Sequence, residues 1–165
     1  MAEPMAEAAL ELTGTATCPW ARICRELREN AAIALDEPTA LEARLLACHL
    51  ELVRGGVDPR EALGKIRHLS GRQGYVLLRC RSTVLTEFAA ARFREPFRLG
   101  RLEDVMAQAS EGGYALLQAE ALRVASIGSP STEQGKRYAA DARTLVERHG
   151  YVTCMRTFAP SSGTR

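Results

Sequence analysis

Cysteine and histidine are the residues of this chain best suited to nucleophilic, acid-base or metal chemistry, yet their spacing matches no usual arrangement for it. The cysteines are odd in number and lack C-x-x-C spacing, which disfavours a disulfide framework or a zinc site and favours a reducing compartment; they are Cys18, Cys24, Cys48, Cys80 and Cys154. No two of the histidines, His49, His68 and His149, have ligand spacing. The motifs G-x-S-x-G, H-E-x-x-H and G-x-x-x-x-G-K-[ST] do not occur. We therefore expect no catalytic residue, no metal and no cofactor, and a protein that is not an enzyme.

Residues 79–101, which we call the arginine segment, are the other stretch with chemical potential. Six arginines and two acids give this segment a charge of +4, against −2 for the rest of the chain, and three phenylalanines lie among them. Guanidinium groups beside aromatic rings can hold carboxylates, phosphates or stacked bases. The candidates for an anionic ligand are Arg92, Arg94, Arg98 and Arg101. The alternative, which we favour, is that Phe88, Phe93 and Phe97 pack a corner between helices while the arginines are solvated.

Composition bounds the class of protein. The chain has 165 residues, 46% of them hydrophobic and 25% charged, which is typical of one globular domain with an alanine and leucine core. Its 22 basic and 20 acidic residues nearly balance, so no overall field draws it to nucleic acid or anionic lipid. The N-terminus has no basic start followed by a long apolar run, and we expect a cytoplasmic protein with no membrane partner.

A repeated phrase indicates the elements that position these residues. The pair Gly-Tyr occurs at Gly74, Gly113 and Gly150, at intervals of 39 and 37 residues. Each interval holds an apolar helical stretch, a breaker with one proline and a second helical stretch. Glycine suits the left-handed residue that closes a helix. The pattern therefore predicts that glycine ends the second helix of each unit and that tyrosine starts the next unit.

This repeated order of helices and breakers predicts an all-α fold, an α-solenoid of antiparallel helix hairpins with about seven helices in a single domain over residues 1–158. The expected units are 3–37, 38–75, 76–114 and 115–151, followed by a partial capping helix at 152–158 and a disordered tail at 159–165.

Local residues predict where helices begin and which faces are buried. Asp58 before Pro59 is typical of an N-cap with a first-turn proline, and Ser131 with Gln134 has capping-box spacing. Apolar residues recur in matching columns of the three first helices, and one column, formed by Ala43, Cys80 and Ala119, stays small. Small residues would let neighbouring helices approach closely.

The phrase "GYALLQAEALRVAS", a breaker and "QGKRYAADARTLVERHGY" resemble the tetratricopeptide (TPR) superfamily, and within it the degenerate repeats of MalT-type bacterial regulators. The resemblance covers residues 39–158, with a period longer than the usual 34 and without the first-helix Trp and Tyr of the strict motif. It implies a bacterial adaptor or regulatory module that binds a peptide or partner domain in the concave groove lined by first helices, without chemistry of its own.

In such a groove the partner would meet the polar positions of the first helices. These candidates vary between units, as recognition of different partner groups requires, although solvated helix faces would look the same; they are Glu42, Arg44, His49, Arg79, Arg81, Glu87, Gln118, Glu120 and Arg123.

Two further functions stay open: binding of nucleic acid or an acidic ligand through the arginine segment, and a purely structural role as a subunit of an enzyme complex. An uncapped apolar end is a liability for a solenoid in water. We therefore expect residues 152–158 to form a short capping helix or to pair with another chain, in a homodimer or larger complex.

Overall fold

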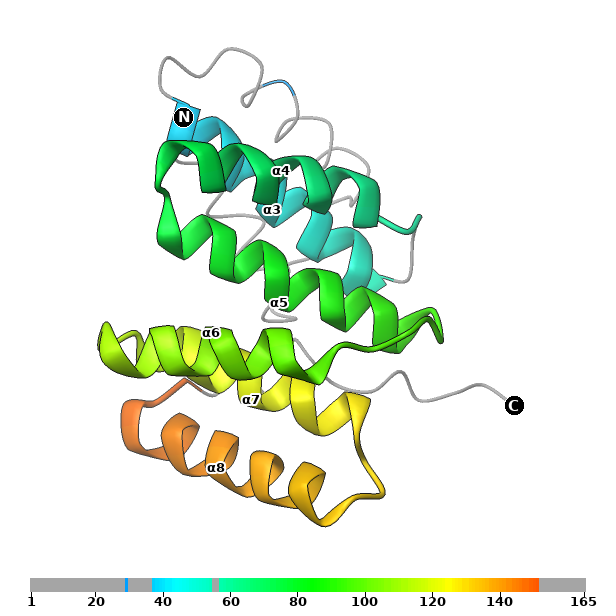
Figure 1. Ribbon diagram of the computed structural model, residues 1–165, viewed down its shortest axis with the longest axis vertical. Coiled ribbons are helices and arrows are strands. Elements are labelled where there is room, and N and C mark those ends of the chain that lie inside the picture. The colour runs from blue at the N-terminus through cyan, green and yellow to red at the C-terminus, as the bar shows by residue number, and fades with distance from the viewer. Residues whose placement is uncertain (1–28, 30–36, 55–56, 152–165) are drawn as a thin grey trace. The chain divides into compact units, whose positions relative to one another are not determined.

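The computed structural model describes Glu29, residues 37–54 and residues 57–151, and this part of the chain is all helical, without a strand. Six helices follow one another, and the chain divides into two compact units at Ser82 and Thr83, within the third of these helices (Figure 1). The all-α class predicted from the sequence is confirmed. The predicted unit 3–37 and the predicted capping helix 152–158 lie outside the described residues, except for Glu29 and Glu37.

The three Gly-Tyr pairs share a left-handed glycine and a tyrosine hydrogen bond, although α6 has Gly112 as an additional C-cap residue before Gly113. Gly74, Gly113 and Gly150 have φ of 75°, 71° and 73°, and they are the only glycines with positive φ in the described part of the chain. After each, the tyrosine N–H donates to the carbonyl five residues earlier, at 2.9 Å to Ser70, 2.8 Å to Ala109 and 3.0 Å to Val146. This is the longer bond of a Schellman cap, which satisfies carbonyls left free at a helix end. The predicted left-handed glycines are confirmed.

The first unit contains α3 (Glu37–Arg54), α4 (Arg60–Gln73) and the first residues of α5 (Val76–Arg92). Helices α3 and α4 contact each other and run in opposite directions (Figure 1). Their apolar faces are buried, with Leu41, Leu45, Cys48 and Leu52 on α3 and Leu63 and Ile66 on α4. The small column is buried as well, at Ala43 and Cys80 here and at Ala119 in the second unit.

Asp58 organises the start of α4. Its Oδ1 accepts a hydrogen bond of 3.0 Å from the backbone N–H of Arg60, and its Oδ2 accepts one of 2.7 Å from Arg60 Nε. The hydrogen bond from the Arg60 side chain is the main cause of the lowered pKa of Asp58. The helix itself begins at Arg60 and its N-cap is Pro59, so the predicted N-cap at Asp58 is wrong by one residue, although the Asp58 carboxylate accepts the first helical N–H.

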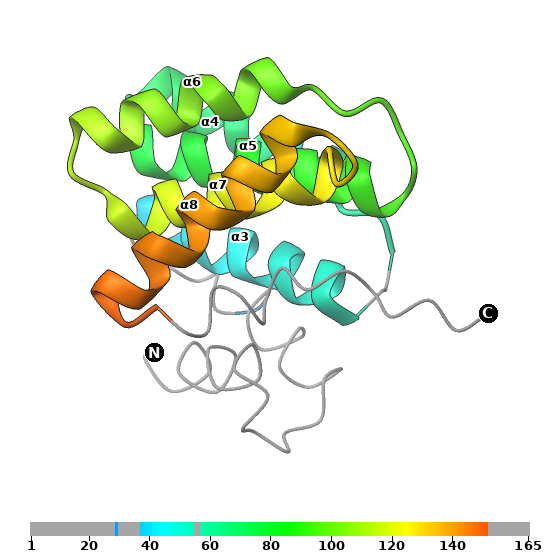
Figure 2. The same cartoon turned by 90° about the horizontal axis from the view of Figure 1, so that it is seen from below.

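The second unit contains the rest of α5 with α6 (Leu99–Glu111), α7 (Ala115–Gly128) and α8 (Glu133–His149). Helix α7 contacts both α6 and α8, as Figure 2 shows from below. Eight of its fourteen residues are buried, from Leu117 to Ser126, so α7 is enclosed on most of its circumference. The second helices contribute Leu102, Val105 and Ala142 to the core, while Ala139 is half-buried.

The predicted capping box at the start of α8 is wrong by one residue. Thr132 is the N-cap, and its Oγ1 accepts a hydrogen bond of 2.9 Å from the backbone N–H of Gly135. A Cβ on Gly135 would lie 1.8 Å from the carbonyl oxygen of Ser129. The turn before α8 therefore needs a glycine three residues after the cap, a constraint from close backbone approach that the Ser-x-x-Gln pattern does not contain.

Side chains also connect the helices of the second unit. The Tyr138 hydroxyl on α8 donates to Glu103 Oε1 on α6 at 2.8 Å and accepts from Gln134 Nε2 at 2.6 Å. The pKa of Tyr138 is raised, first by burial and then by its hydrogen bond to Glu103. The ring of Phe97 lies against Gly128, where an added Cβ would come within 2.3 Å of it. Phe97 thus packs the corner beside the C-terminus of α7.

Candidate functional site

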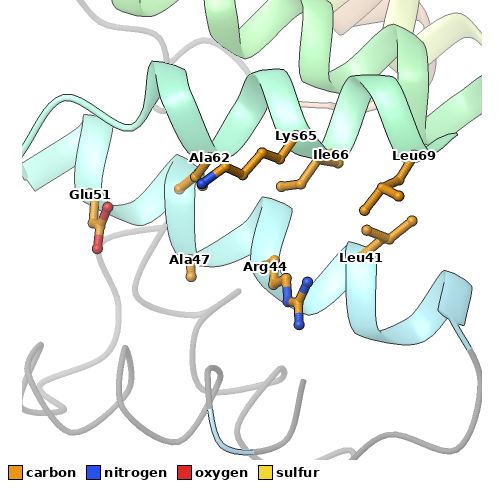
Figure 3. A pocket seen from close by; sticks show the side chains of 9 residues that line it. Leu41, Arg44, Ala47, Glu51, Ala62, Lys65, Ile66 and Leu69 are labelled. Carbon is orange, nitrogen blue, oxygen red and sulfur yellow. The ribbon is translucent and has the colours of Figure 1, made fainter. Parts of the chain in front are cut away.

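A groove with an apolar floor runs between α3 and α4 in the first unit, and we call it the α3–α4 groove (Figure 3). Its volume is about 260 Å³. Figure 3 shows Leu41 beside Leu69 at one end and Glu51 at the other. The residues that line it are Leu41, Arg44, Ala47, Cys48, Glu51, Ala62, Lys65, Ile66 and Leu69.

The groove forms because short side chains stand between long ones. Ala62 lies between the helices, where a longer residue would fill the space, and Ala47 lines the groove on α3 (Figure 3). Ser70, which follows on α4, turns inward and donates its hydroxyl proton to the carbonyl of Ile66, so it satisfies itself within the helix. Most of the lining side chains are apolar, which favours an apolar occupant.

Charges border the apolar floor. Arg44 is exposed, and Lys65 makes an ion pair of 2.6 Å with Glu61, one turn earlier on α4. Both partners of that pair are largely exposed, so water screens the pair and its contribution to stability is small. Arg44 is thus positioned to meet an acidic group that approaches the groove from solvent, whereas Lys65 is shared with Glu61 and the acidic Glu51 lies at the other end of the groove.

Of the groove candidates predicted on α3, two are accessible and one is not. Glu42 and Arg44 are exposed, and Arg44 lines the α3–α4 groove. His49 is 3% exposed. Eight residues of α3 are buried, including every residue from Ala47 to Leu50, because the helix is covered on more than the single stripe that the sequence pattern predicts.

Burial makes His49 a neutral core residue. Its removal from water, together with the positive charge of Arg81, lowers its pKa from 6.5 to about 3. Since the charged imidazolium is disfavoured until strongly acid pH, His49 cannot serve there as a cation for a partner at neutral pH. The expectation that this position lies outside the core is wrong.

The candidates on α5 and α7 divide in the same way. Arg79 is exposed, and three others are half-buried, Arg81, Gln118 and Arg123. Glu87 and Glu120 are buried, so the expectation that they lie outside the core is also wrong. Glu120 belongs to α7, which is enclosed on most sides, and Glu87 points toward the start of α6.

Glu87 has a structural role within the second unit. Its Oε2 accepts a hydrogen bond of 2.8 Å from the backbone N–H of Arg98, the N-cap residue of α6, and its Oε1 lies 3.2 Å from Arg101 Nη1. A carboxylate at a helix N-terminus is favoured by the free N–H groups and the helix dipole. Glu87 therefore anchors the start of α6.

This arrangement changes what the arginine segment offers to a ligand. The guanidinium of Arg101 is committed to Glu87, Phe88 is buried, and Phe97 packs on Gly128, so only Phe93 of the three phenylalanines is exposed. Arg94 and Arg98 are exposed and Arg92 is half-buried, and Arg94 has a φ of 57° in the bend between α5 and α6. Packing of the corner, the alternative favoured from the sequence, agrees with Phe88 and Phe97.

Sequence reasoning missed half of the groove because it searched the first helices only. Ala62, Lys65 and Leu69 lie on α4, a second helix. The available signal was the side of α4 that carries Ala62, Ile66 and Leu69 at helical spacing, next to the buried stripe.

Cysteine and metal chemistry gain no support from the geometry. Cys48 and Cys80 are buried, as expected of small core residues, and burial raises the pKa of the Cys80 thiol and so disfavours a reactive thiolate. No group of three or more His, Cys, Asp or Glu side chains suited to a metal ion occurs in the described residues. None of the described helices is long and apolar enough to span a bilayer.

Comparison with known protein families, with curated proteins and with solved structures found no match for this chain. The TPR resemblance is accordingly a prediction from the repeated sequence phrase.

Proposed function

We propose that this protein is a non-catalytic interaction module that binds a helical segment of a partner protein in the α3–α4 groove. The observation that carries the proposal is an apolar floor bordered by Arg44 and Lys65 on neighbouring helices. A peptide helix with two apolar side chains at i and i+4 presents them on one face and could place both on this floor. An acidic residue one turn away would then lie near Arg44.

The left-handed glycine and the tyrosine hydrogen bond shared by Gly74, Gly113 and Gly150 support a second part of the proposal, a TPR-like solenoid of similar helix pairs. In a solenoid each pair contacts its neighbours in sequence, and the groove backbone is fixed before a partner arrives. The partner then loses conformational freedom largely alone, which favours affinity.

A selection experiment tests the groove. A displayed library of 16-residue peptides would be selected on the full chain, and the consensus should show Leu, Ile or Met at i and i+4 with Asp or Glu one turn away. The change Ala62→Trp fills the groove and should weaken the selected peptides at least about tenfold, equivalent to about 1.4 kcal/mol. The matched control is Ala140→Trp, at an exposed position of α8, which should leave affinity unchanged.

Two results would overturn the proposal. Selected peptides that bind the Ala62→Trp chain as tightly as the unaltered chain would place binding elsewhere. A photo-reactive residue at position 62 that cross-links only to residues 1–36 of the same chain would show that the protein fills its own groove.

Nucleic-acid binding through the arginine segment is a less supported alternative, because Arg101 and two phenylalanines are engaged within the second unit. The salt dependence of binding tests this alternative, because the affinity for an oligonucleotide should fall steeply between low and moderate ionic strength. A structural subunit role, without a ligand of its own, predicts that the peptide selection returns no consensus.

A further inference from the structure

The face of α4 turned away from the α3–α4 groove carries a second hollow, which we call the α4 hollow. It is open to solvent, has a volume of about 390 Å³, and is lined by Gly64, Arg67, His68, Gly71 and Arg72. Groove residues such as Ala62 and Ile66 lie two residues from Gly64 along the helix. At 100° per residue this places the hollow on the opposite side of α4.

No close packing contact in the described structure requires glycine at the two glycine positions of the hollow. A Cβ on Gly64 would meet no atom within 4 Å, and one on Gly71 would meet only Arg79 Cδ, at 3.9 Å. Neither has positive φ. Glycine weakens a helix relative to alanine, so both positions favour stability less than they could. What the missing side chains provide is room for another backbone to approach α4 closely.

The surround of the hollow is positively charged. Arg67, His68 and Arg72 are basic, and no acidic residue lines the hollow. Their side chains make no hydrogen bond or ion pair with the rest of the described chain; the ion pairs of this helix involve Arg60 and Lys65 instead. Positive charge that is not balanced locally favours a partner surface of opposite sign.

The shape of the hollow indicates the class of partner. Small-molecule sites enclose most of their ligand, whereas this hollow is shallow and extends along the helix. Gly64 and Gly71 are seven residues apart, about 10 Å along the axis, which matches two turns of a second helix. No Phe, Tyr or Trp ring lines the hollow for base stacking, and the total charge of +2 gives little attraction for a polyanion, so nucleic acid fits less well.

We propose that the outer face of α4 binds an acidic α-helical segment of a partner protein. The partner backbone passes over Gly64 and Gly71, and its Asp or Glu side chains meet Arg67 and Arg72. This site is separate from the α3–α4 groove and does not depend on the function proposed for that groove.

The probe is a fluorescein-labelled 20-residue peptide with an alanine ridge and glutamates at i and i+4, compared with the same peptide carrying glutamines. Fluorescence anisotropy with the full chain should show binding of the glutamate peptide, weakened by salt, and at least about tenfold weaker binding of the glutamine peptide. Equal affinity for both peptides, or no binding of the glutamate peptide, would overturn the proposal.

Variants separate a binding role from a structural one. Gly64→Leu and Gly71→Leu should raise the thermal midpoint or leave it unchanged, because leucine favours helix and its Cβ meets at most Arg79 Cδ, at 3.9 Å, yet lower the peptide affinity about tenfold or more. Arg67→Glu should weaken binding likewise, whereas Ala140→Leu on α8 should not. Unchanged affinity in both glycine variants contradicts the proposal.

Two further comparisons identify the site and the class of partner. Ala62→Trp, which fills the α3–α4 groove, should leave binding of the glutamate peptide intact, so the two proposals can fail separately. A single-stranded oligonucleotide of the same charge should bind more weakly than the peptide. Tighter binding of the oligonucleotide, lost in Gly71→Leu, would assign the hollow to nucleic acid and overturn the acidic-helix proposal.

Discussion

Arg101 on α6 holds its Nη1 atom 3.2 Å from Oε1 of Glu87 on α5, a side chain that is only 2% exposed. The carboxylate also accepts the backbone N–H of Arg98 at 2.8 Å. A buried charge is tolerated only when it is paired and hydrogen-bonded. The two residues therefore stabilise the junction between α5 and α6.

Removal of the Arg101 guanidinium should leave this carboxylate without its charged partner. We expect Arg101→Met to lower the free energy of unfolding by about 1–3 kcal/mol, less than for a fully buried pair because Arg101 is 37% exposed and water partly replaces it. Urea unfolding measures the loss. The control is Arg98→Met, which keeps the backbone donor and should cost less than about 0.5 kcal/mol. Equal losses in the two variants would refute a specific role for the Arg101 charge.

Two glycine substitutions should change the free energy of unfolding in opposite directions. Gly135→Ala drives a methyl group into the Ser129 carbonyl, 1.8 Å away, and should cost about 2 kcal/mol or more. Gly64→Ala, in the interior of α4 with open space around it, should stabilise by about 0.5–1 kcal/mol. Thermal unfolding of both variants checks the pair, and destabilisation by Gly64→Ala would mean that this position has a packing partner.

At the Schellman caps, substitution of glycine should lower the free energy of unfolding because of backbone conformation alone. Gly74→Ala and Gly150→Ala place a Cβ at φ of 75° and 73°, which should cost about 1–2 kcal/mol each although nothing lies within 4 Å of that atom. Gly71→Ala, one turn before Gly74 on the same helix, should not destabilise. If Gly71→Ala and Gly74→Ala have the same effect on urea unfolding, the left-handed conformation is not what selects glycine.

His49 should make stability depend on pH between 5 and 7. Its folded pKa is about 3 against 6.5 for the free side chain, so below pH 6.5 the unfolded chain binds a proton that the folded chain does not. Stability is then complete above pH 6.5 and falls on acidification by up to about 1.4 kcal/mol per pH unit. Asp58, whose lowered pKa starts from 3.8, acts at more acidic pH.

The measurement is the slope of unfolding free energy against pH in unaltered protein and in His49→Gln. Comparison of slopes removes any constant loss from the substitution itself. The free energy of unfolding of the variant should be nearly independent of pH between pH 5 and 7. A slope that survives in His49→Gln would assign the pH dependence to other groups.

Backbone requirements were the part of this fold that the sequence predicted best. Left-handed conformation strongly favours glycine, so Gly74, Gly113 and Gly150 could be placed without knowledge of any contact. The same is true of apolar columns such as Leu41, Leu45 and Cys48, because helical spacing alone decides which residues share a face.

The burial of polar positions was harder to predict from the sequence, because it depends on how much of each helix is covered by neighbouring helices. Glu42 and His49 both read as groove candidates, yet Glu42 is exposed and His49 is buried. The sequence pattern predicts Glu87 as a groove residue, but its carboxylate binds the backbone N–H of Arg98, eleven residues later. Arg98 lies in the bend before α6, where helical spacing predicts no contacts. The N-cap is Thr132 and not Ser131, because the residue three positions after the cap lies against the Ser129 carbonyl and must be glycine, which is Gly135.

The three left-handed glycines also bear on how this protein could change over evolutionary time. A side chain in a core can be exchanged when its neighbours adjust, whereas a positive φ offers few acceptable replacements whatever surrounds it. Distant homologues should therefore retain glycine, or asparagine, at intervals near 37 and 39 residues after their cores and surfaces have diverged. A search weighted toward those intervals would detect ancestry that overall identity conceals.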